Sequence, residues 1–136
     1  MLNPQERKKI KQLMQREIIP AIGCTEPVAV SLCVAQATET LGRKPKQIEV
    51  ILSSNVLKNA MGVGIPGTGM IGLPIAVALG ALIGKPEYGL EVLRDLQPAD
   101  VERAKQYIQD KRIKIDVEKE IEDKLLLQHG CIYVAP

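Results

Sequence analysis

The chain has 136 residues, enough for one compact domain and too few for two ordinary ones. Hydrophobic residues make up 46% and charged residues 25%, which is typical of a soluble globular protein and excludes a disordered chain. The net charge of +2 is too small to indicate a polyanionic binding partner, so nucleic-acid binding is set aside. Three cysteines and a polar, charged beginning without a signal peptide predict a cytoplasmic protein with reduced thiols.

The first two segments predict helices of opposite character. Asn3, Pro4 and Glu6 form a helix start, and a stripe of apolar residues at helical spacing continues to Ile18 before Pro20 ends the helix. That stripe consists of Ile10, Leu13, Met14 and Ile18. A second helix start at residues 25–27 leads into residues 28–41, which are apolar nearly all round and predict a buried helix.

The middle of the chain carries a strand and a long uncharged stretch. Residues 46–54 are rich in Ile and Val and predict a strand, and residues 55–59 predict a turn or a single helical turn. No residue from 59 to 84 is charged, but glycine and proline interrupt the first half. Only residues 73–83 form a good apolar helix, which is too short to cross a bilayer, so we expect a buried core helix there.

The remaining pattern completes the fold class. Helices are expected at residues 87–96 and 98–109, and strands at residues 112–118 and 124–134. This order predicts a single α+β domain over residues 1–136, of the irregular α/β kind. Its helices would pack on a small mixed sheet, with the buried Gly/Ala-rich helix at the centre.

Cys24 lies immediately before the second helix. The unpaired N–H groups and the positive end of the helix dipole favour a thiolate at this place, which would suit a metal ligand or a nucleophile. The alternative is a small buried hydrophobic residue at a turn.

A second group of polar residues follows the first strand and continues into a glycine-rich loop. Such a loop can bind a small anion, for instance the carboxylate of an amino acid, with Lys58 supplying charge. An ordinary glycine-rich turn packed against a helix is the alternative. The candidate residues are Ser53, Asn55, Lys58, Asn59 and Thr68.

Other motifs give weaker support for a function or none. Residues 62–67 match the dinucleotide fingerprint G-x-G-x-x-G, but they do not directly follow the strand and Pro66 would disturb the turn, so this function is rejected. His129 and Cys131 would share one face of a strand, but two ligands do not close a metal site. Cys33 is expected to pack in the core.

Several of these segments resemble the signatures of the L-cysteine desulfidase family, which is related to the α-type domain of iron–sulfur L-serine dehydratases. The resemblance covers about residues 4–118, and its motifs are long and specific. The matching runs are residues 20–27 (PAIGCTEP), 54–63 (SNVLKNAMGV), 66–76 (PGTGMIGLPIA) and 89–93 (GLEVL).

The resemblance implies a β-elimination that gives pyruvate, ammonia and, from cysteine, sulfide. A [4Fe–4S] cluster held by three cysteines would act as a Lewis acid on the leaving group. Cys24 corresponds to the family's N-terminal cysteine and would be a cluster ligand or otherwise catalytic. Lys58 is a candidate for the base that removes the α-proton. Ser53, Asn55, Asn59 and Thr68 fall where substrate-binding groups are expected.

This sequence departs from the pattern of the family in its length. Family members are longer and carry their other cluster cysteines in a C-terminal part, so we expect an N-terminal portion that is inactive and holds no cluster. The alternatives are a stand-alone amino-acid-binding module without catalysis, and an assembly subunit that docks through the Ile10, Leu13 and Met14 face. We expect no membrane partner, and the oligomeric state stays open, with a homo-oligomer as one option because the missing part would leave an apolar face exposed. The choice between cysteine and serine, the proton acceptor and the roles of His129 and Cys131 stay open.

Overall fold

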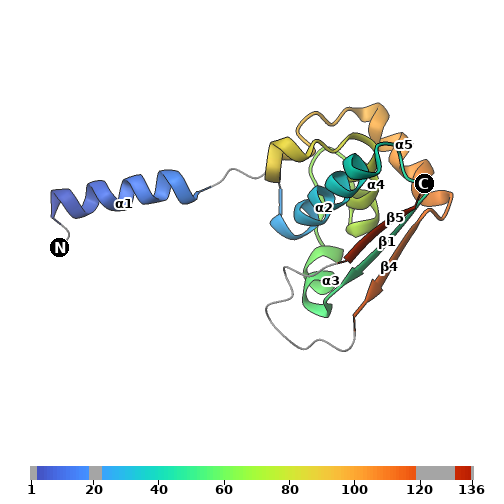
Figure 1. Ribbon diagram of the computed structural model, residues 1–136, viewed down its shortest axis with the longest axis horizontal. Helices are drawn as coiled ribbons and strands as arrows, with labels where there is room; N and C mark the ends of the chain where they lie inside the picture. Colours follow the sequence, from blue (N-terminus) through green and yellow to red (C-terminus); the bar gives the residue numbers. More distant parts are fainter. Residues whose placement is uncertain (1–2, 19–22, 119–130, 136) are drawn as a thin grey trace.

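The computed structural model describes residues 3–18, 23–118 and 131–135, the last of these as backbone only. In chain order the elements are α1 (Pro4–Glu17), α2 (Thr25–Leu41), β1 (Gln47–Leu52), α3 (Ser54–Met61), β2 (Gly64–Ile65), β3 (Met70–Ile71), α4 (Leu73–Ile83), the 3₁₀ helix η1 (Pro86–Glu91), α5 (Pro98–Gln109), β4 (Ile113–Val117) and β5 (Cys131–Ala135). This arrangement confirms the α+β class, with helices packed on a small mixed sheet (Figure 1).

A three-stranded sheet covers one side of the helices. Its order is β4-β1-β5, with β1 parallel to β4 and antiparallel to β5. Ile48, Val50 and Leu52 alternate along β1 and are buried, whereas Gln47 is exposed and Glu49 and Ile51 are half-buried. The alternation predicted from sequence is therefore present because one face of β1 packs on the core.

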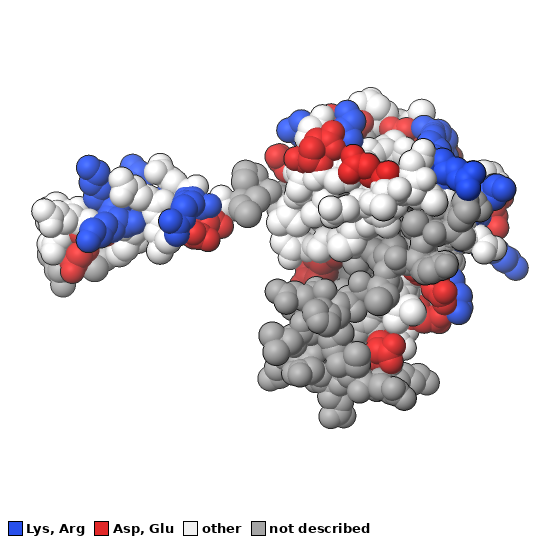
Figure 2. Space-filling view, in the orientation of Figure 1, with Lys and Arg blue, Asp and Glu red and all other residues white. Residues whose placement is uncertain are grey.

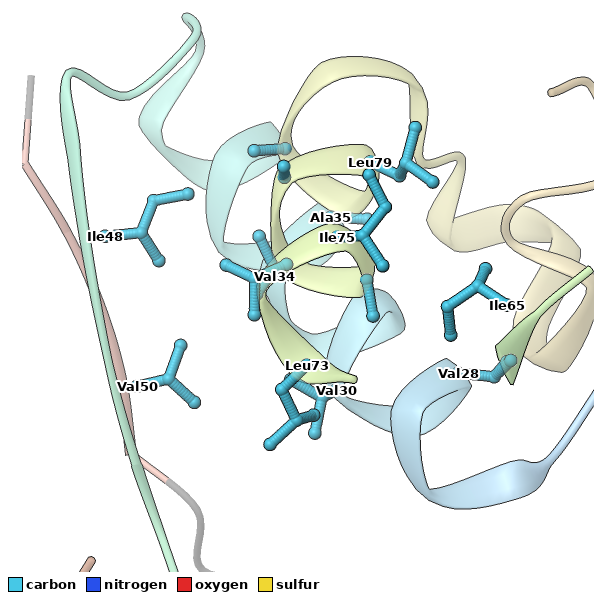
Figure 3. Packing of buried hydrophobic residues seen from close by; sticks show 14 of the residues in the cluster. Val28, Val30, Val34, Ala35, Ile48, Val50, Ile65, Leu73, Ile75 and Leu79 are labelled. Atoms are coloured by element: carbon cyan, nitrogen blue, oxygen red, sulfur yellow. The ribbon is translucent and has the colours of Figure 1, made fainter. Parts of the chain in front are cut away.

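Helix α4 is the centre of the fold, as predicted. Every residue from Leu73 to Ala81 except Pro74 is buried. Figure 3 shows Ile48 and Val50 of β1 on one side of α4 and Val34 of α2 beside it.

Small residues let α2 and α4 approach each other closely. A Cβ atom added to Gly80 would lie 2.5 Å from the carbonyl oxygen of Ser31, and one added to Gly84 would lie 2.6 Å from the Cβ atom of Ala35. The Ser31 hydroxyl, which is fully buried, donates a hydrogen bond to the carbonyl oxygen of Ala76. The glycines of this stretch thus serve helix packing.

Helix α1 has a different environment. A capping box joins Asn3 and Glu6, and Pro4 occupies the first helical position, as predicted. None of its residues is buried, and it extends away from the other elements in Figure 1. Figure 2 shows Lys and Arg side chains along α1 with acidic side chains near its two ends. Among the described residues, no helix has both the length and the apolar character that a membrane span requires.

Three expectations need correction. Residues 87–96 do not form an α-helix: η1 is followed by turns, because Gly89 adopts φ 55° and ψ −128° and interrupts the helical path. Residues 55–59 belong to α3, which is longer than a single turn. Cys33 lies on the exposed face of α2 and not in the core.

The last predicted strand is described only in part. Within residues 124–134, the structure describes β5 from Cys131 onward, where its backbone pairs with β1. His129 lies outside the described residues, as do the positions of the β5 side chains.

Candidate functional site

Cys24 is the N-cap residue of α2 and its side chain is exposed. The thiol donates a hydrogen bond to Oε2 of Glu26 at 3.2 Å, and Oγ1 of Thr25 donates to the same oxygen at 3.3 Å. The bond from Cys24, followed by a backbone N–H, lowers the pKa of Glu26 below its ordinary value. The sulfur does not accept a capping hydrogen bond from the helix. The sulfur is therefore exposed, and its hydrogen bond to Glu26 fixes its orientation.

The turn before Cys24 packs against the glycine-rich segment. Gly23 has φ +88°, and a Cβ atom at this position would lie 2.9 Å from Cδ of Pro66. Only a glycine fits, because both the left-handed backbone and the close proline ring exclude a side chain. This contact brings the Cys24 turn next to the β2–β3 hairpin, which is far from it in the sequence.

The glycine-rich segment forms that hairpin and uses Thr68 to close it. The Thr68 hydroxyl lies 2.7 Å from the carbonyl oxygen of Ile65 and 3.2 Å from that of Met70, and it accepts a bond from the Met70 N–H at 3.0 Å. The residue is only 9% exposed. Its single hydroxyl proton is thus taken up by backbone acceptors inside the turn, which favours a structural role over substrate binding.

The other polar candidates gather on α3. Ser53 is the N-cap and accepts a hydrogen bond from the N–H of Val56 at 3.4 Å. Asn55, Lys58 and Asn59 are exposed and stand at i, i+3 and i+4, so they share one helix face. Within the described part of the chain, none of these three side chains makes a hydrogen bond or ion pair.

The hydrophobic side of α3 explains this orientation. Val56 and Ala60 are buried, which turns the opposite face, with its two amides and one ammonium group, toward solvent. Helix α3 also contacts α2. The hairpin therefore adjoins the turn before Cys24 through Pro66, and the C-terminal end of α3 adjoins the hairpin, because a Cβ atom added to Gly72 would lie 3.2 Å from the carbonyl oxygen of Met61.

The described residues offer only part of a metal site. No group of three His, Cys, Asp or Glu side chains comes together in residues 3–18 and 23–118 in a way that would hold a metal ion. Cys33 is nine positions after Cys24, which is roughly 13 Å along the helix at 1.5 Å per residue, too far to share one ion. Although Cys33 is exposed as a residue, neighbouring side chains partly desolvate its sulfur, which raises the pKa of the thiol and disfavours the thiolate that metals bind. Among the cysteines whose side chains the structure describes, Cys24 therefore stays the candidate ligand.

Sequence reasoning missed the role of Glu26. Its position two residues after a cysteine N-cap was visible, because side chains in the first turn of a helix can reach back to the cap.

Comparison with known proteins gives relatives but no activity. No family model matches the chain, and no solved structure does. The chain is 65% identical over 130 residues to a UPF0597 protein of Bacteroides fragilis, a match that covers 96% of this chain and 30% of that protein. A UPF0597 protein of Bacteroides thetaiotaomicron is 64% identical over 126 residues, covering 93% and 29%, and one of Oleidesulfovibrio alaskensis is 51% identical over 117 residues, covering 86% and 27%.

These relatives are longer than this chain. The chain spans about 30% of the length of the curated relatives it matches. Their shared name states no substrate, cofactor or reaction.

Proposed function

We propose that the chain is the N-terminal part of a cytoplasmic carbon–sulfur or carbon–oxygen lyase of the L-cysteine desulfidase type. The observation that carries the proposal is the exposed Cys24 thiol at the start of α2, hydrogen-bonded to a carboxylate and packed beside the glycine-rich hairpin. The signature-like runs around Cys24 and through residues 54–76 support the same function. The substrate would be L-cysteine or L-serine.

In this proposal each group has a role that its position allows. Cys24 would be one ligand of a [4Fe–4S] cluster, and Glu26 would orient the thiol through their hydrogen bond, with the thiol proton lost to solvent on metal binding. The other ligands come from outside the described residues. Lys58, as its neutral amine, would accept the α-proton, and Asn55 and Asn59, on the same face of α3, would bind the substrate.

The two hydroxyl residues have supporting roles. Ser53 fixes the start of α3 and keeps its hydroxyl proton available for a substrate oxygen. Thr68 holds the hairpin in shape, because its own hydrogen bonds are made within the turn.

A binding module without catalysis is the second candidate. It is favoured by one observation: the described residues supply a single candidate cluster ligand, while the amide and ammonium groups of α3 are free to bind an amino acid. A module of this kind would bind L-cysteine or L-serine and release it unchanged.

A chimera tests the lyase. In the Bacteroides fragilis relative, the matched 130-residue segment is replaced by this chain, and the protein is purified without oxygen. We expect iron–sulfur absorbance together with release of pyruvate, and of sulfide when L-cysteine is the substrate. The 136-residue chain purified in the same way should be colourless and release neither product.

Two cysteine variants make the test specific. Cys24→Ser in the chimera should reduce both cluster content and activity at least tenfold, whereas Cys33→Ser, on the exposed face of the same helix, should change neither. If Cys24→Ser keeps its cluster and activity, the role given to Cys24 is wrong. A chimera that binds either amino acid without turnover supports the binding module instead.

A further inference from the structure

A pocket lies between the turn of the β2–β3 hairpin and the segment that follows η1. Its volume is about 250 Å³. Its walls are mainly aliphatic and carry a single charged group. The lining residues are Ile65, Pro66, Gly67, Leu93, Arg94 and Leu96.

The charged group, Arg94, is held in place by an aromatic ring. The centre of its guanidinium lies 3.7 Å from the centroid of the Tyr88 ring, which is the stacked geometry of a cation–π contact. The Tyr88 hydroxyl lies 3.2 Å from Oδ2 of Asp95, which helps to fix the ring. A planar group held in this way loses less conformational freedom when it binds a ligand.

The acidic side chains of Glu91 and Asp95 act on the Arg94 guanidinium through their charges, although neither lies within ion-pair distance of it. Asp95 instead forms an ion pair with Lys85 at 2.7 Å, and this pair together with the Tyr88 bond occupies the same oxygen. In the part of the chain that the structure describes, Arg94 has no ion-pair partner. A guanidinium that stacks on a tyrosine ring and is outside any ion pair, at the mouth of an aliphatic pocket, matches a ligand that has a carboxylate at one end and an apolar body at the other.

We propose that this pocket binds a small aliphatic carboxylate, with Arg94 as the anchor of the carboxylate group and Leu93 and Leu96 as the walls for its carbon chain. Pro66 links the pocket to the Cys24 turn, because the same ring packs against Gly23. The inference rests on the pocket alone and holds whether or not the lyase proposal is correct.

The test uses the 136-residue chain and 3-methylbutanoate as the probe. Methyl resonances of Ile65, Leu93 and Leu96 are followed by NMR during titration. We expect saturable shifts with the carboxylate. The neutral isostere 3-methylbutanamide and inorganic phosphate should bind at least tenfold more weakly, since the first lacks the charge and the second lacks the carbon chain.

Variants assign the binding to this site. Arg94→Gln should weaken binding at least tenfold, Tyr88→Leu should weaken it less, and Leu96→Phe should block it by filling the pocket. Arg103→Gln is the matched control, because Arg103 is an exposed arginine paired with Asp100 on α5, and it should change nothing.

Four results would overturn the inference. They are the absence of saturable shifts with 3-methylbutanoate, equal binding of the amide, phosphate binding as strong as that of the carboxylate, and unchanged affinity in Arg94→Gln. None of them involves a cluster or turnover, so this failure is distinct from a failure of the lyase proposal.

Discussion

Helices α1 and α4 are the two extremes of this molecule. Helix α1 has 14 residues, most of them charged or polar, and none of its residues is buried. Helix α4 has 11 residues, no charge, and almost no exposed surface. Both begin with a proline in the first turn, so local start signals do not distinguish them.

The difference shows what each helix depends on. Helix α1 is supported by its own capping box and leaves the apolar side chains of Ile10, Leu13, Met14 and Ile18 between 41% and 64% exposed. Helix α4 contains glycine and β-branched residues, which are weak helix formers. It is stable because α2, α5 and the sheet surround it, so its stability is tertiary.

The largest effect is expected from truncating the core of α4. Leu79 is fully buried, and Leu79→Ala should lower the free energy of unfolding by about 3 kcal/mol through lost burial and the cavity left behind. The same change in α1, Leu13→Ala, should stay within about 0.5 kcal/mol, because Leu13 is 51% exposed. Urea unfolding of both variants measures this contrast, and equal losses would show that α1 is packed against something in solution.

A smaller effect is expected where α4 meets α2. Gly80→Ala adds a methyl group 2.5 Å from a backbone oxygen of Ser31, so it should cost about 2 kcal/mol although alanine is the better helix former. Gly62→Ala is the matched control, since nothing lies within 4 Å of its added Cβ atom. Thermal unfolding should separate the two, and a Gly80→Ala protein as stable as the parent would contradict the close helix contact.

The smallest effect is expected on the pKa of Glu26, in the first turn of α2. The carboxyl group of Glu26 should titrate below its ordinary pKa of 4.5, and Cys24→Ala should move the midpoint back upward by removing the main cause. Because the pKa is lowered in the folded state, the stabilisation is present above about pH 4.5 and is lost as the pH falls through the lower value.

Carboxyl-detected NMR provides the readout for this titration. Thr25→Ala is the control, since Thr25 is the weakest contributor to the shift and its removal should move the midpoint less. A midpoint that Cys24→Ala leaves unchanged would mean that the thiol does not bind the carboxylate in solution.

Much of the fold could be predicted from sequence because local signals and burial agreed. The sequence predicts α4 at residues 73–83, and the helix is Leu73–Ile83. The prediction succeeds because Gly72 and Gly84 bound the run of apolar residues and so mark both ends of the helix. The segment at residues 87–96 failed for the opposite reason. Its composition suits a helix, but the backbone of Gly89 takes up a conformation that composition does not reveal.

The candidate site was predictable in part. The spacing of Asn55, Lys58 and Asn59 already implied a shared face once the segment was helical. The contact between Gly23 and Pro66 joins residues 43 positions apart, and no local sequence pattern predicts it. The same holds for Arg94, because its stacking on Tyr88 depends on how the turns after η1 run.

The order of the strands has a consequence for synthesis on the ribosome. Strand β1 emerges early, but Ile48 pairs with Ile113, which is 65 positions later, and Gln47 pairs with Ala135 later still. A nascent chain that has reached only α4 therefore carries β1 with both edges unpaired. Until β4 arrives, that strand is open to pairing with a neighbouring copy, and the slow step of folding is expected to be closure of the sheet.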